Sequence, residues 1–596
     1  MNKPIESRKA SLVLWGLGII PVVWAALMVA PFLSEGLSGI LSGFISGMDN
    51  PTAITWCMDS PKAIFILLLI YGLGIGIYYA MKRNYRKGEE HGSAKWGNPK
   101  QLAKKYADRD RMKNILLTQN TRIGLDGRKH HRNLNVMVVG GSGSGKTRYF
   151  AKPNVMQAAS TSFIVLDSKG EILRDTGYLL EKQGYEIRVL DLINMHRSHG
   201  YNPFVYLHDD KDVLKLVNNI VRNTTPKGAQ SNDPFWERAE TALMEALILY
   251  LVNEAPPHEQ NFPMVMEMIG AAEVREEDEE YASVLDELFE RLEMHDPEHL
   301  AVKQYHIFKL AAGKTAKSIL ISLGVRLEKF NLASIAGITT MDEMDLPSIG
   351  EKKTALFAVI PDNDSSFNFL IGMLYTQLFQ ELFYLADYTY GGRLPVHVHF
   401  VMDEFSNVAL PDDFSKILSV MRSRSVSASI LLQNVTALKA LFEKEWEAII
   451  GNCDEFLYLG GNEQSTHEYV SKMLGKATID TNTYGKSTGR SGNYSTNYQI
   501  SGRELYTPDE VRMLDNQYAL LFIRGERAVQ DKKYDILRHP NIKLTADGGM
   551  PPYIHGQAPL AFDIDEILLD GAYEDYEVLS EDELNELLKE LEEQNK

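Results

Sequence analysis

The hydrophobic pattern of the chain begins with two long stretches that carry no charge. Residues 10–34 read ASLVLWGLGIIPVVWAALMVAPFLS, and residues 63–81 read AIFILLLIYGLGIGIYYAM. Each is close to the roughly 20 apolar residues that a helix needs to cross a bilayer. We predict transmembrane helices at about 11–33 and 63–81, within an N-terminal membrane anchor over 1–90. A cleaved signal peptide for the first stretch and a buried core helix for the second are the alternatives.

The basic residues that flank these stretches predict an orientation. Lys3, Arg8 and Lys9 precede the first stretch, and a basic cluster over 82–87 follows the second. The connecting loop has no Lys or Arg before Lys62. Positive charge is retained on the cytoplasmic side. We therefore expect a multi-pass protein of the cell membrane, with both termini and the body after about residue 83 in the cytoplasm.

Beyond the anchor, short apolar runs alternate with helix-length segments, which favours a parallel α/β sheet. The predicted strands are 135–139, 162–167, 186–192, 355–361, 397–403, 427–433, 455–460 and 519–525. Between 209 and 353 the pattern is helical throughout. We predict a RecA-like nucleotide-binding domain in two parts, 91–208 and 354–550, with an inserted all-helical domain over 209–353 and an acidic tail over 551–596.

One segment of low complexity interrupts the α/β pattern. Residues 480–502 read DTNTYGKSTGRSGNYSTNYQISG, rich in Gly and Ser, and predict a mobile loop. The segment interleaves aromatic with cationic residues, as a contact to single-stranded DNA would need. A solvated loop is the alternative. The residues concerned are Tyr484, Lys486, Arg490, Tyr494 and Tyr498.

Composition narrows the functional classes. The chain has 596 residues and a net charge of −18, which argues against one broad nucleic-acid-binding surface but leaves room for a narrow basic channel. Cys57 and Cys453 are its two cysteines, so a disulfide framework or a cysteine metal site is excluded. Much of the acid lies in two blocks, residues 273–293 and the tail. The leucines of the tail recur at helical spacing and could form a docking helix for basic proteins.

The clearest chemical motif is VVGGSGSGKT at 138–147, which follows an apolar run and precedes a helical segment. It matches the phosphate-binding P-loop, in which glycines let backbone N–H groups turn toward the phosphates. Lys146 would reach the outer phosphates, and Thr147 would bind Mg²⁺. The predicted ATP-binding residues are Gly140, Gly141, Ser142, Gly143, Ser144, Gly145, Lys146 and Thr147.

A second motif supplies carboxylates. HVHFVMDEFSN puts Asp403 and Glu404 directly after an apolar strand, the form of a Walker B end. We predict that Asp403 holds Mg²⁺ and that Glu404 orients or deprotonates the attacking water. A solvated acidic pair is the alternative.

Other polar residues lie at predicted strand or helix ends, and each has a structural alternative. Gln433 ends the next strand and could contact the γ-phosphate. Arg422 and Arg424 could act on a neighbouring subunit's nucleotide, or simply favour the end of a helix dipole. Asp167 could serve the nucleotide site, while Ser168 and Glu171 have the spacing of a capping box for the following helix.

Several motifs together resemble the type IV coupling proteins of conjugation systems. In order they are the P-loop, FIVLDSKGEI, YNPF, DPFWERAE, VMDEFSN, ILLQN, IIGNCDEFLYLGGNEQSTHEYVSKMLGK and RELYTPDEVRMLD. The resemblance runs from the anchor to about residue 540. One departure is Ser168, where the family often has proline.

The resemblance implies a membrane-anchored ATPase that uses ATP and Mg²⁺ and is pictured as a homo-hexamer. It would link a relaxase–DNA complex, with its accessory proteins, to a type IV secretion channel and drive transfer of single-stranded DNA. It supports nucleotide roles for Gly145, Lys146, Thr147, Asp403, Glu404 and Gln433, and a trans-acting role for Arg422 or Arg424. The alternatives are an ATP-gated receptor that does not pump and a double-stranded DNA translocase of the chromosome-segregation type.

Overall fold

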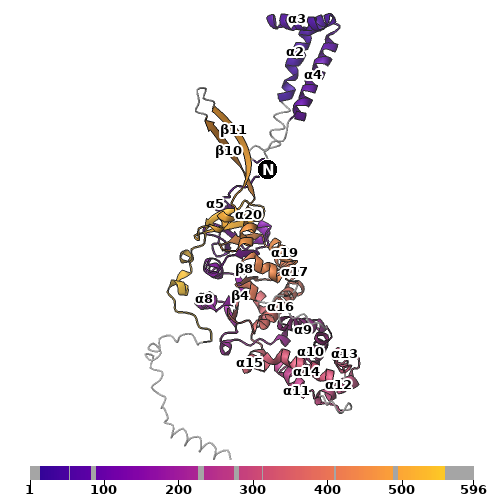
Figure 1. Ribbon diagram of the computed structural model, residues 1–596, viewed down its shortest axis with the longest axis vertical. Helices are drawn as coiled ribbons and strands as arrows, with labels where there is room; N and C mark the ends of the chain where they lie inside the picture. The colour runs from indigo at the N-terminus through magenta and orange to yellow at the C-terminus, as the bar shows by residue number, and fades with distance from the viewer. Residues whose placement is uncertain are drawn as a thin grey trace, which may run out of the picture. The chain divides into compact units, whose positions relative to one another are not determined.

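The computed structural model describes residues 14–52, 54–81, 89–225, 234–273, 281–311, 313–407, 411, 413–486 and 494–556 (Figure 1). The chain divides into two compact units. The first comprises Met1–His91 and Thr478–Ser501, and the second comprises Gly92–Ala477 and Gly502–Lys596. The basic flanks at 3–9 and 82–87 and the acidic tail from 557 onward lie outside the described residues.

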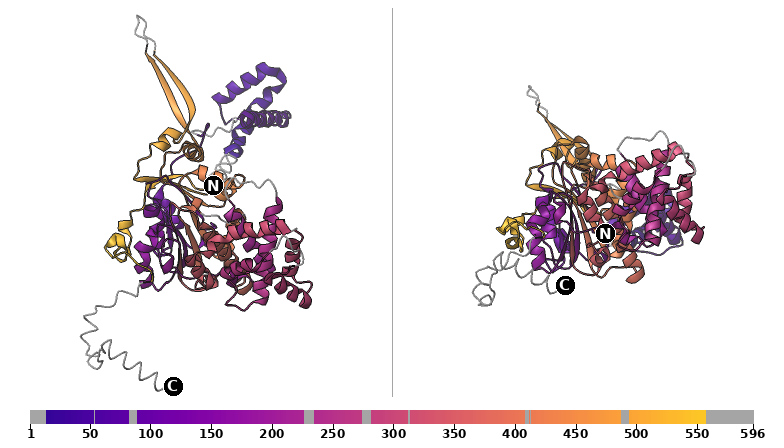
Figure 2. Two further views of the ribbon diagram at one scale, coloured as in Figure 1. Left: turned by 60° about the horizontal axis from the view of Figure 1, so that its bottom comes forward. Right: turned by 90° about the horizontal axis from the view of Figure 1, so that it is seen from below.

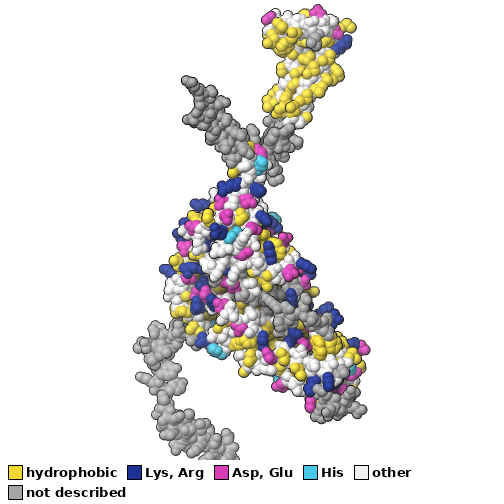
Figure 3. Space-filling model, in the orientation of Figure 1, with side chains coloured by type: hydrophobic (Ala, Val, Ile, Leu, Met, Phe, Trp, Pro, Cys, Tyr) yellow, Lys and Arg dark blue, Asp and Glu magenta, His cyan; other side chains and the backbone are white. Residues whose placement is uncertain are grey.

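The first unit contains the predicted apolar helices. Two helices, Leu14–Glu35 and Ser60–Met81, are long and apolar enough to cross a membrane. The first comprises α2 (Ile19–Val29) and the 3₁₀ segment η1 (Ala30–Glu35), and the second is α4 (Ser60–Met81). Hydrophobic side chains cover their outer surface (Figure 3), and Phe65 on α4 is 68% exposed. The Tyr71 hydroxyl donates to the Trp15 carbonyl at 2.9 Å and joins the two helices.

The segment between these helices is more ordered than the expected short loop. It contains α3 (Gly36–Asp49), and the glycines of that helix allow close packing. A Cβ at Gly43 would lie 2.7 Å from the Phe32 ring, and one at Gly47 would lie 2.5 Å from the Met28 sulfur.

The loop predicted over 480–502 is wrong, because the segment forms two strands. β10 (Lys476–Lys486) and β11 (Tyr494–Glu504) make a two-stranded sheet of their own. Thr, Ile and Tyr recur through both strands, and these β-branched and aromatic residues favour extended backbone. The Gly and Ser content concealed that signal. Residue 490 and the side chains of 480–499, including the proposed DNA contacts, lie outside the described residues.

The second unit is built on a nine-stranded sheet with the order β13-β12-β9-β3-β8-β7-β4-β6-β5. The seven strands from β9 to β5 are parallel, whereas β12 pairs antiparallel with β9 and β13 antiparallel with β12. All eight predicted strands are confirmed. Their bounds are β3 Val136–Val139, β4 Thr161–Ser168, β5 Glu186–Asp191, β6 Thr354–Ile360, β7 His397–Met402, β8 Val426–Leu432, β9 Glu455–Tyr458 and β12 Tyr518–Ile523.

Three short strands were not predicted. β13 (Val529–Lys532) is mostly polar, and β1 (Asn114–Leu116) and β2 (Arg122–Gly124) are too short for periodicity to register. β1 and β2 form a separate antiparallel ladder.

At both edges of the large sheet, loops form hydrogen bonds with backbone groups of the edge strand. On β5, the Val189 N–H donates to the His199 ring at 3.0 Å, and the Asp191 N–H donates to the Ser198 hydroxyl at 3.0 Å. On β13, the Lys532 carbonyl accepts from the Gln119 N–H at 2.8 Å. Neither edge therefore offers a complete row of unpaired backbone groups.

Alternate residues of each strand enter two different cores, one on each face of the sheet. Val136 and Val138 pack into a core with Phe150 and with α8 (Glu171–Lys182), whereas Met137 and Val139 face a core that includes α16 (Asn368–Tyr384). The remaining helices that accompany the sheet are α5 Pro99–Tyr106, α6 Gly127–His130, α17 Phe414–Met421, α18 Val435–Leu441, α19 Trp446–Gly451, α20 Gln464–Leu474 and α21 Pro508–Arg512.

Between β5 and β6 the described residues form only helices and turns (Figure 2). Their apolar side chains continue the core that covers the Met137 face of the sheet. The boundaries 209–353 of a separate helical domain stay a prediction. The helices are α9 Asp210–Thr224, α10 Pro234–Glu254, α11 Phe262–Ala271, α12 Val284–His295, α13 Leu300–Lys309, α14 Gly313–Leu327 and α15 Ala333–Thr340.

A buried ion pair joins three of these helices. Glu240 of α10 is 3% exposed, and its carboxylate accepts from Arg326 Nε of α14 at 2.7 Å. Arg326 Nη1 also donates to the Val221 carbonyl of α9 at 3.1 Å and to the Thr224 hydroxyl at 2.9 Å. Removal of either charged partner would leave the other buried and unpaired.

We expect Glu240→Leu to lower the free energy of unfolding by about 3 kcal/mol, because the Arg326 guanidinium loses its counter-charge. Thermal denaturation of the full-length protein in detergent would measure the effect. Glu237→Leu, on the exposed face of the same helix, is the matched control, and Glu240→Leu combined with Arg326→Met should recover most of the loss. Equal melting temperatures for Glu240→Leu and Glu237→Leu would contradict the expectation.

Candidate functional site

The P-loop follows β3 and leads into a helix. The first helical turn, η2 (Thr147–Ala151), is wider than an α-helix, and α7 (Lys152–Val155) continues it. The predicted helix is therefore present and ends at Val155. Gly145 has φ +81°, which a residue with a side chain rarely adopts. A Cβ at Gly140 would lie 2.3 Å from the Ser144 hydroxyl oxygen, so the loop requires glycine at both positions.

The loop presents donors that can bind an anion. Within the described residues, the N–H groups of Gly143 and Gly145 donate to no protein acceptor. The Lys146 ammonium is 7% exposed and donates to the Gly140 carbonyl at 2.9 Å, which holds it against the loop. Free backbone N–H groups, a helix N-terminus and a buried lysine together suit phosphate oxygens.

The Walker B residues reach this loop from β7. Asp403 follows β7 directly, and its Oδ2 accepts a hydrogen bond from the Thr147 hydroxyl at 2.6 Å. Asp403 is 5% exposed, and burial raises the pKa of its carboxyl group, while the bond from Thr147 opposes that rise. A divalent cation beside Asp403 would favour the charged carboxylate.

A hydroxyl and a carboxylate at this position are hard oxygen ligands of the kind that Mg²⁺ takes together with water and phosphate oxygens. Among the described residues no group of three or more His, Cys, Asp or Glu side chains could hold a metal ion by itself. The residues thus fit a Mg²⁺ ion that arrives with a nucleotide.

Glu404 and Gln433 meet beside the same loop. Sheet order puts β8 between β3 and β7, so Gln433, which follows β8, lies between the two motifs. Its amide Nε2 donates to Glu404 Oε2 at 3.1 Å, and Lys146 Nζ lies 4.0 Å from Glu404 Oε1. Glu404 has φ +51°, a left-handed conformation that costs of order 1 kcal/mol and re-aims its side chain after the strand.

Asp167 caps the following helix, whereas the sequence left open a capping box formed by Ser168 and Glu171. α8 has Gly170 at its N-cap, with φ +67°, so the predicted capping box is wrong. Asp167 lies three residues farther back, and its carboxylate accepts from the Leu173 N–H at 2.8 Å. Burial raises the pKa of Asp167 to about 7, and the charge of Asp403 adds to the rise. Asp167 therefore caps α8 and lies close enough to Asp403 for their charges to interact.

The two arginines lie at the other end of β8 from Gln433. They form the turn η9 (Arg422–Arg424), which precedes the strand, so about 20 Å of extended chain separates them from the P-loop edge. Arg424 is held within the chain, since its Nη2 lies 2.6 Å from Asp387 Oδ2 and its guanidinium covers the Phe383 ring.

Arg422, by contrast, is exposed and lines a cavity of about 540 Å³ with three other arginines, Arg128, Arg132 and Arg393. Neither Arg422 nor Arg424 belongs to the nucleotide site of its own chain.

A lysine that the sequence did not indicate supports the P-loop. Lys533 follows β13, is 6% exposed, and donates to the Ser144 carbonyl at 2.9 Å and to Asn516 Oδ1 at 2.7 Å. Burial lowers the pKa of its ammonium group to about 8. Its strand was not predicted, and a lone lysine has no motif, so only the three-dimensional structure identifies it.

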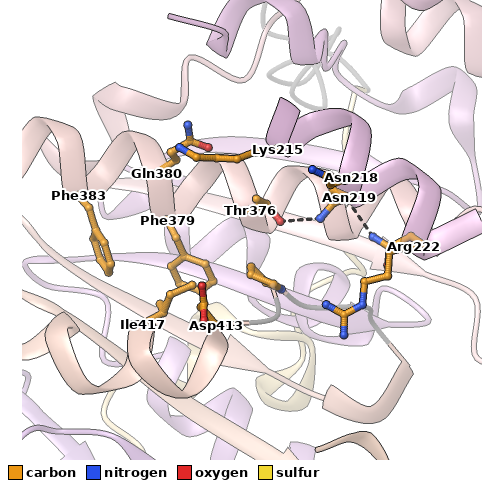
Figure 4. Close-up of a pocket in the computed structure, with 12 residues that line it drawn as sticks. Lys215, Asn218, Asn219, Arg222, Thr376, Phe379, Gln380, Phe383, Asp413 and Ile417 are labelled. Atoms are coloured by element: carbon orange, nitrogen blue, oxygen red, sulfur yellow. Dashed lines mark hydrogen bonds between the residues drawn. The ribbon is translucent and has the colours of Figure 1, made fainter. Parts of the chain in front are cut away.

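A further cavity of about 420 Å³ lies between α9, α16 and the start of α17 (Figure 4). Asn219 and Arg222 line one side, Phe379 and Ile417 another. Asn219 Nδ2 donates to the Thr376 hydroxyl at 2.9 Å. None of the strand-end residues described above lines this cavity, so it is separate from the P-loop.

The chain resembles known proteins along most of its length. Residues 95–547 match the family model described as "Type IV secretory system Conjugative DNA transfer". Among curated proteins, it is 22% identical over 391 residues to Protein VirD4 of Rhizobium radiobacter, covering 62% of this chain and 52% of that protein. It is 19% identical over 407 residues to the conjugal transfer protein TraG of Rhizobium radiobacter, covering 65% and 60%. The chain thus spans between half and two thirds of these relatives' length.

Solved structures show the same fold. The plasmid coupling protein TrwB in complex with ADP and Mg²⁺ has a TM-score of 0.55 and 15% identity, covering 74% of this chain and 93% of that one. The unbound bacterial conjugative coupling protein TrwB has a TM-score of 0.54 and 14% identity, covering 77% and 98%. This likeness confirms the RecA-like P-loop fold. Because the family model matches most of the chain, the protein belongs to the type IV secretory system conjugative DNA-transfer family.

Proposed function

We propose that the protein is a membrane-anchored ATPase that couples a relaxase–DNA complex to a type IV secretion channel and drives single-stranded DNA through it. The two apolar N-terminal helices form the anchor, and both termini and the ATPase body lie in the cytoplasm. The body assembles as a homo-hexameric ring. Family membership supports the conjugative role, and one feature of the site supports the ATPase.

That feature is the meeting of the P-loop with the end of β7, where the Thr147 hydroxyl lies 2.6 Å from Asp403. The loop from Gly140 to Lys146 binds the phosphates of ATP, and Thr147 and Asp403 hold Mg²⁺, which neutralises charge on the phosphate oxygens. Glu404 orients the attacking water and accepts its proton. Gln433 donates a hydrogen bond to Glu404 and so connects that carboxylate to β8. Its amide contacts the γ-phosphate and changes position when that phosphate is lost.

Arg422 is the trans-acting arginine in this proposal. Arg424 already pairs with Asp387, whereas Arg422 is exposed and lies in an arginine-lined cavity at the edge of the sheet opposite the P-loop. In a ring, the P-loop edge of one subunit faces a different surface of the neighbouring subunit. An arginine on that surface can stabilise the negative charge that develops on the phosphates during hydrolysis.

We propose that loops in the central channel of the ring contact the DNA strand and are driven along it by hydrolysis. Electrostatic, sequence-independent contact with the strand is expected to be salt-sensitive. A DNA contact by Lys486 and Arg490, and docking of basic relaxosome proteins by the acidic tail, stay predictions.

The first test is ATP hydrolysis by the full-length protein in detergent or nanodiscs, with and without single- and double-stranded DNA. We expect stimulation by single strands and a loss of about 10²-fold in Lys146→Ala, because the phosphates lose their main cation. Lys113→Ala, outside the site, is the control. A hydrolysis rate that neither form of DNA changes would favour a gated receptor. A rate that double-stranded DNA raises more than single-stranded DNA would favour a segregation-type translocase.

The second test separates nucleotide binding from chemistry. Glu404→Gln should lower kcat by about 10²-fold or more while ATP binding is kept, since the amide cannot accept the proton. Gln433→Ala should lower kcat less. Fluorescent-nucleotide titration and steady-state kinetics would measure both. An unchanged kcat in Glu404→Gln would remove Glu404 from the mechanism.

The third test uses mixed rings. Arg422→Ala should lower ATPase activity by about 10³-fold, the scale of an arginine finger. Arg424→Ala, the matched control, should keep most activity. Because an Arg422→Ala subunit retains its P-loop and a Lys146→Ala subunit retains its arginine, mixing the two inactive proteins should restore part of the activity. No recovery in mixtures that form rings would contradict action in trans.

A further inference from the structure

A third cavity gathers arginines from three separate segments and contains no residue of the P-loop motif. It has a volume of about 300 Å³ and lies beside the β1–β2 ladder. Arg111 comes from the loop before β1, Arg122 from β2, and Arg538 from the turn η10 (Ile536–Arg538). The buried Tyr534 side chain forms part of the wall. Every residue that lines this cavity is among those described.

The positive charge of this cavity is poorly balanced. Arg538 Nε lies 3.3 Å from Asp535 Oδ2, but within the described residues Arg111 and Arg122 pair with no carboxylate. Asp531 forms no ion pair with either of them among the described residues. It accepts from the Thr118 hydroxyl at 2.7 Å and from the Asn120 side-chain amide at 2.9 Å. Both guanidinium groups are therefore available to an anion.

Thr121 provides an independent sign of a ligand. It lines the same cavity, is 1% exposed, and its hydroxyl oxygen is buried with no hydrogen-bond partner in the described part of the chain. Buried hydroxyl groups in native proteins nearly always have a partner, so this one points to a bound group with polar atoms. Gln119 and Asn120 add side-chain amides to the wall. Guanidinium, hydroxyl and amide groups are all hydrogen-bond donors to phosphate oxygens.

We propose that this cavity is a second phosphate-binding site, distinct from the P-loop, which takes the phosphate groups of a soluble phosphate ester or of a lipid headgroup. Arginines suit this ligand because each guanidinium can donate two parallel hydrogen bonds to phosphate oxygens. The volume accommodates a phosphate or diphosphate but leaves little room for a nucleobase.

The walls of the cavity also contact the P-loop helix. Gln157 lines it two residues after that helix ends, and its amide donates to the Arg111 carbonyl at 2.8 Å and to the Asn114 carbonyl at 3.0 Å. Tyr534 is adjacent in sequence to Lys533, whose ammonium group donates a hydrogen bond to the Ser144 carbonyl of the P-loop. A bound phosphate would thus brace the far end of the helix whose near end holds the nucleotide.

The test measures pyrophosphate binding to the full-length protein in neutral detergent. All variants carry Lys146→Ala, so that the P-loop contributes little. We expect saturable binding by calorimetry, with Kd raised at least about tenfold in Arg111→Gln/Arg122→Gln. Arg109→Gln, an exposed neighbour that does not line the cavity, is the matched control and should bind as its parent does. Sodium chloride at equal ionic strength controls for screening.

Equal pyrophosphate affinity in the double variant and in Arg109→Gln, or no binding at all, would overturn the proposal. The melting temperature without pyrophosphate checks that the double variant is folded, and Arg538→Gln replaces it if it is not. Nanodiscs of phosphatidylcholine, with or without phosphatidic acid, then identify the source. Weaker pyrophosphate binding in the presence of phosphatidic acid would assign the site to a lipid headgroup, and unchanged binding would assign it to a soluble phosphate ester.

Discussion

The hydrogen bond from the Thr147 hydroxyl to Asp403 is the constraint on which the rest of the site depends. It joins two motifs that lie more than 250 residues apart and that belong to strands separated by β8. The bond is possible because parallel strands bring their carboxyl ends to one edge of the sheet. The same geometry puts Gln433 between the two motifs and sends Arg422 and Arg424 to the opposite edge.

The elements that could be predicted from sequence were those that depend on local chemistry. Buried parallel strands read as continuous apolar runs, so β4, β6 and β8 were evident. The glycines of the P-loop and the carboxylates after β7 likewise have to be adjacent in sequence to function. For these features, one stretch of chain contains all the information.

The features that could not be predicted depend on contacts between distant segments. β13 is polar and becomes a strand because β12 lies beside it. Lys533 supports the P-loop only because that strand is present, and the pairing of Arg424 with Asp387 joins residues that are 37 positions apart in sequence. At α8 the error was local. A serine with capping-box spacing competed with a glycine that can adopt the left-handed conformation, and the buried carboxylate of Asp167 supplied the cap instead.

The loops that satisfy both edges of the large sheet bear on solubility and assembly. An open strand edge can pair with the edge of another copy, and such pairing leads to aggregation. Here the loop at Ser198 and His199 shields β5, and the segment at Gln119 shields the short β13. Because these backbone groups are already hydrogen-bonded, the two edges of the large sheet are poorly suited to strand pairing with another copy, and a contact at either edge would be made by side chains.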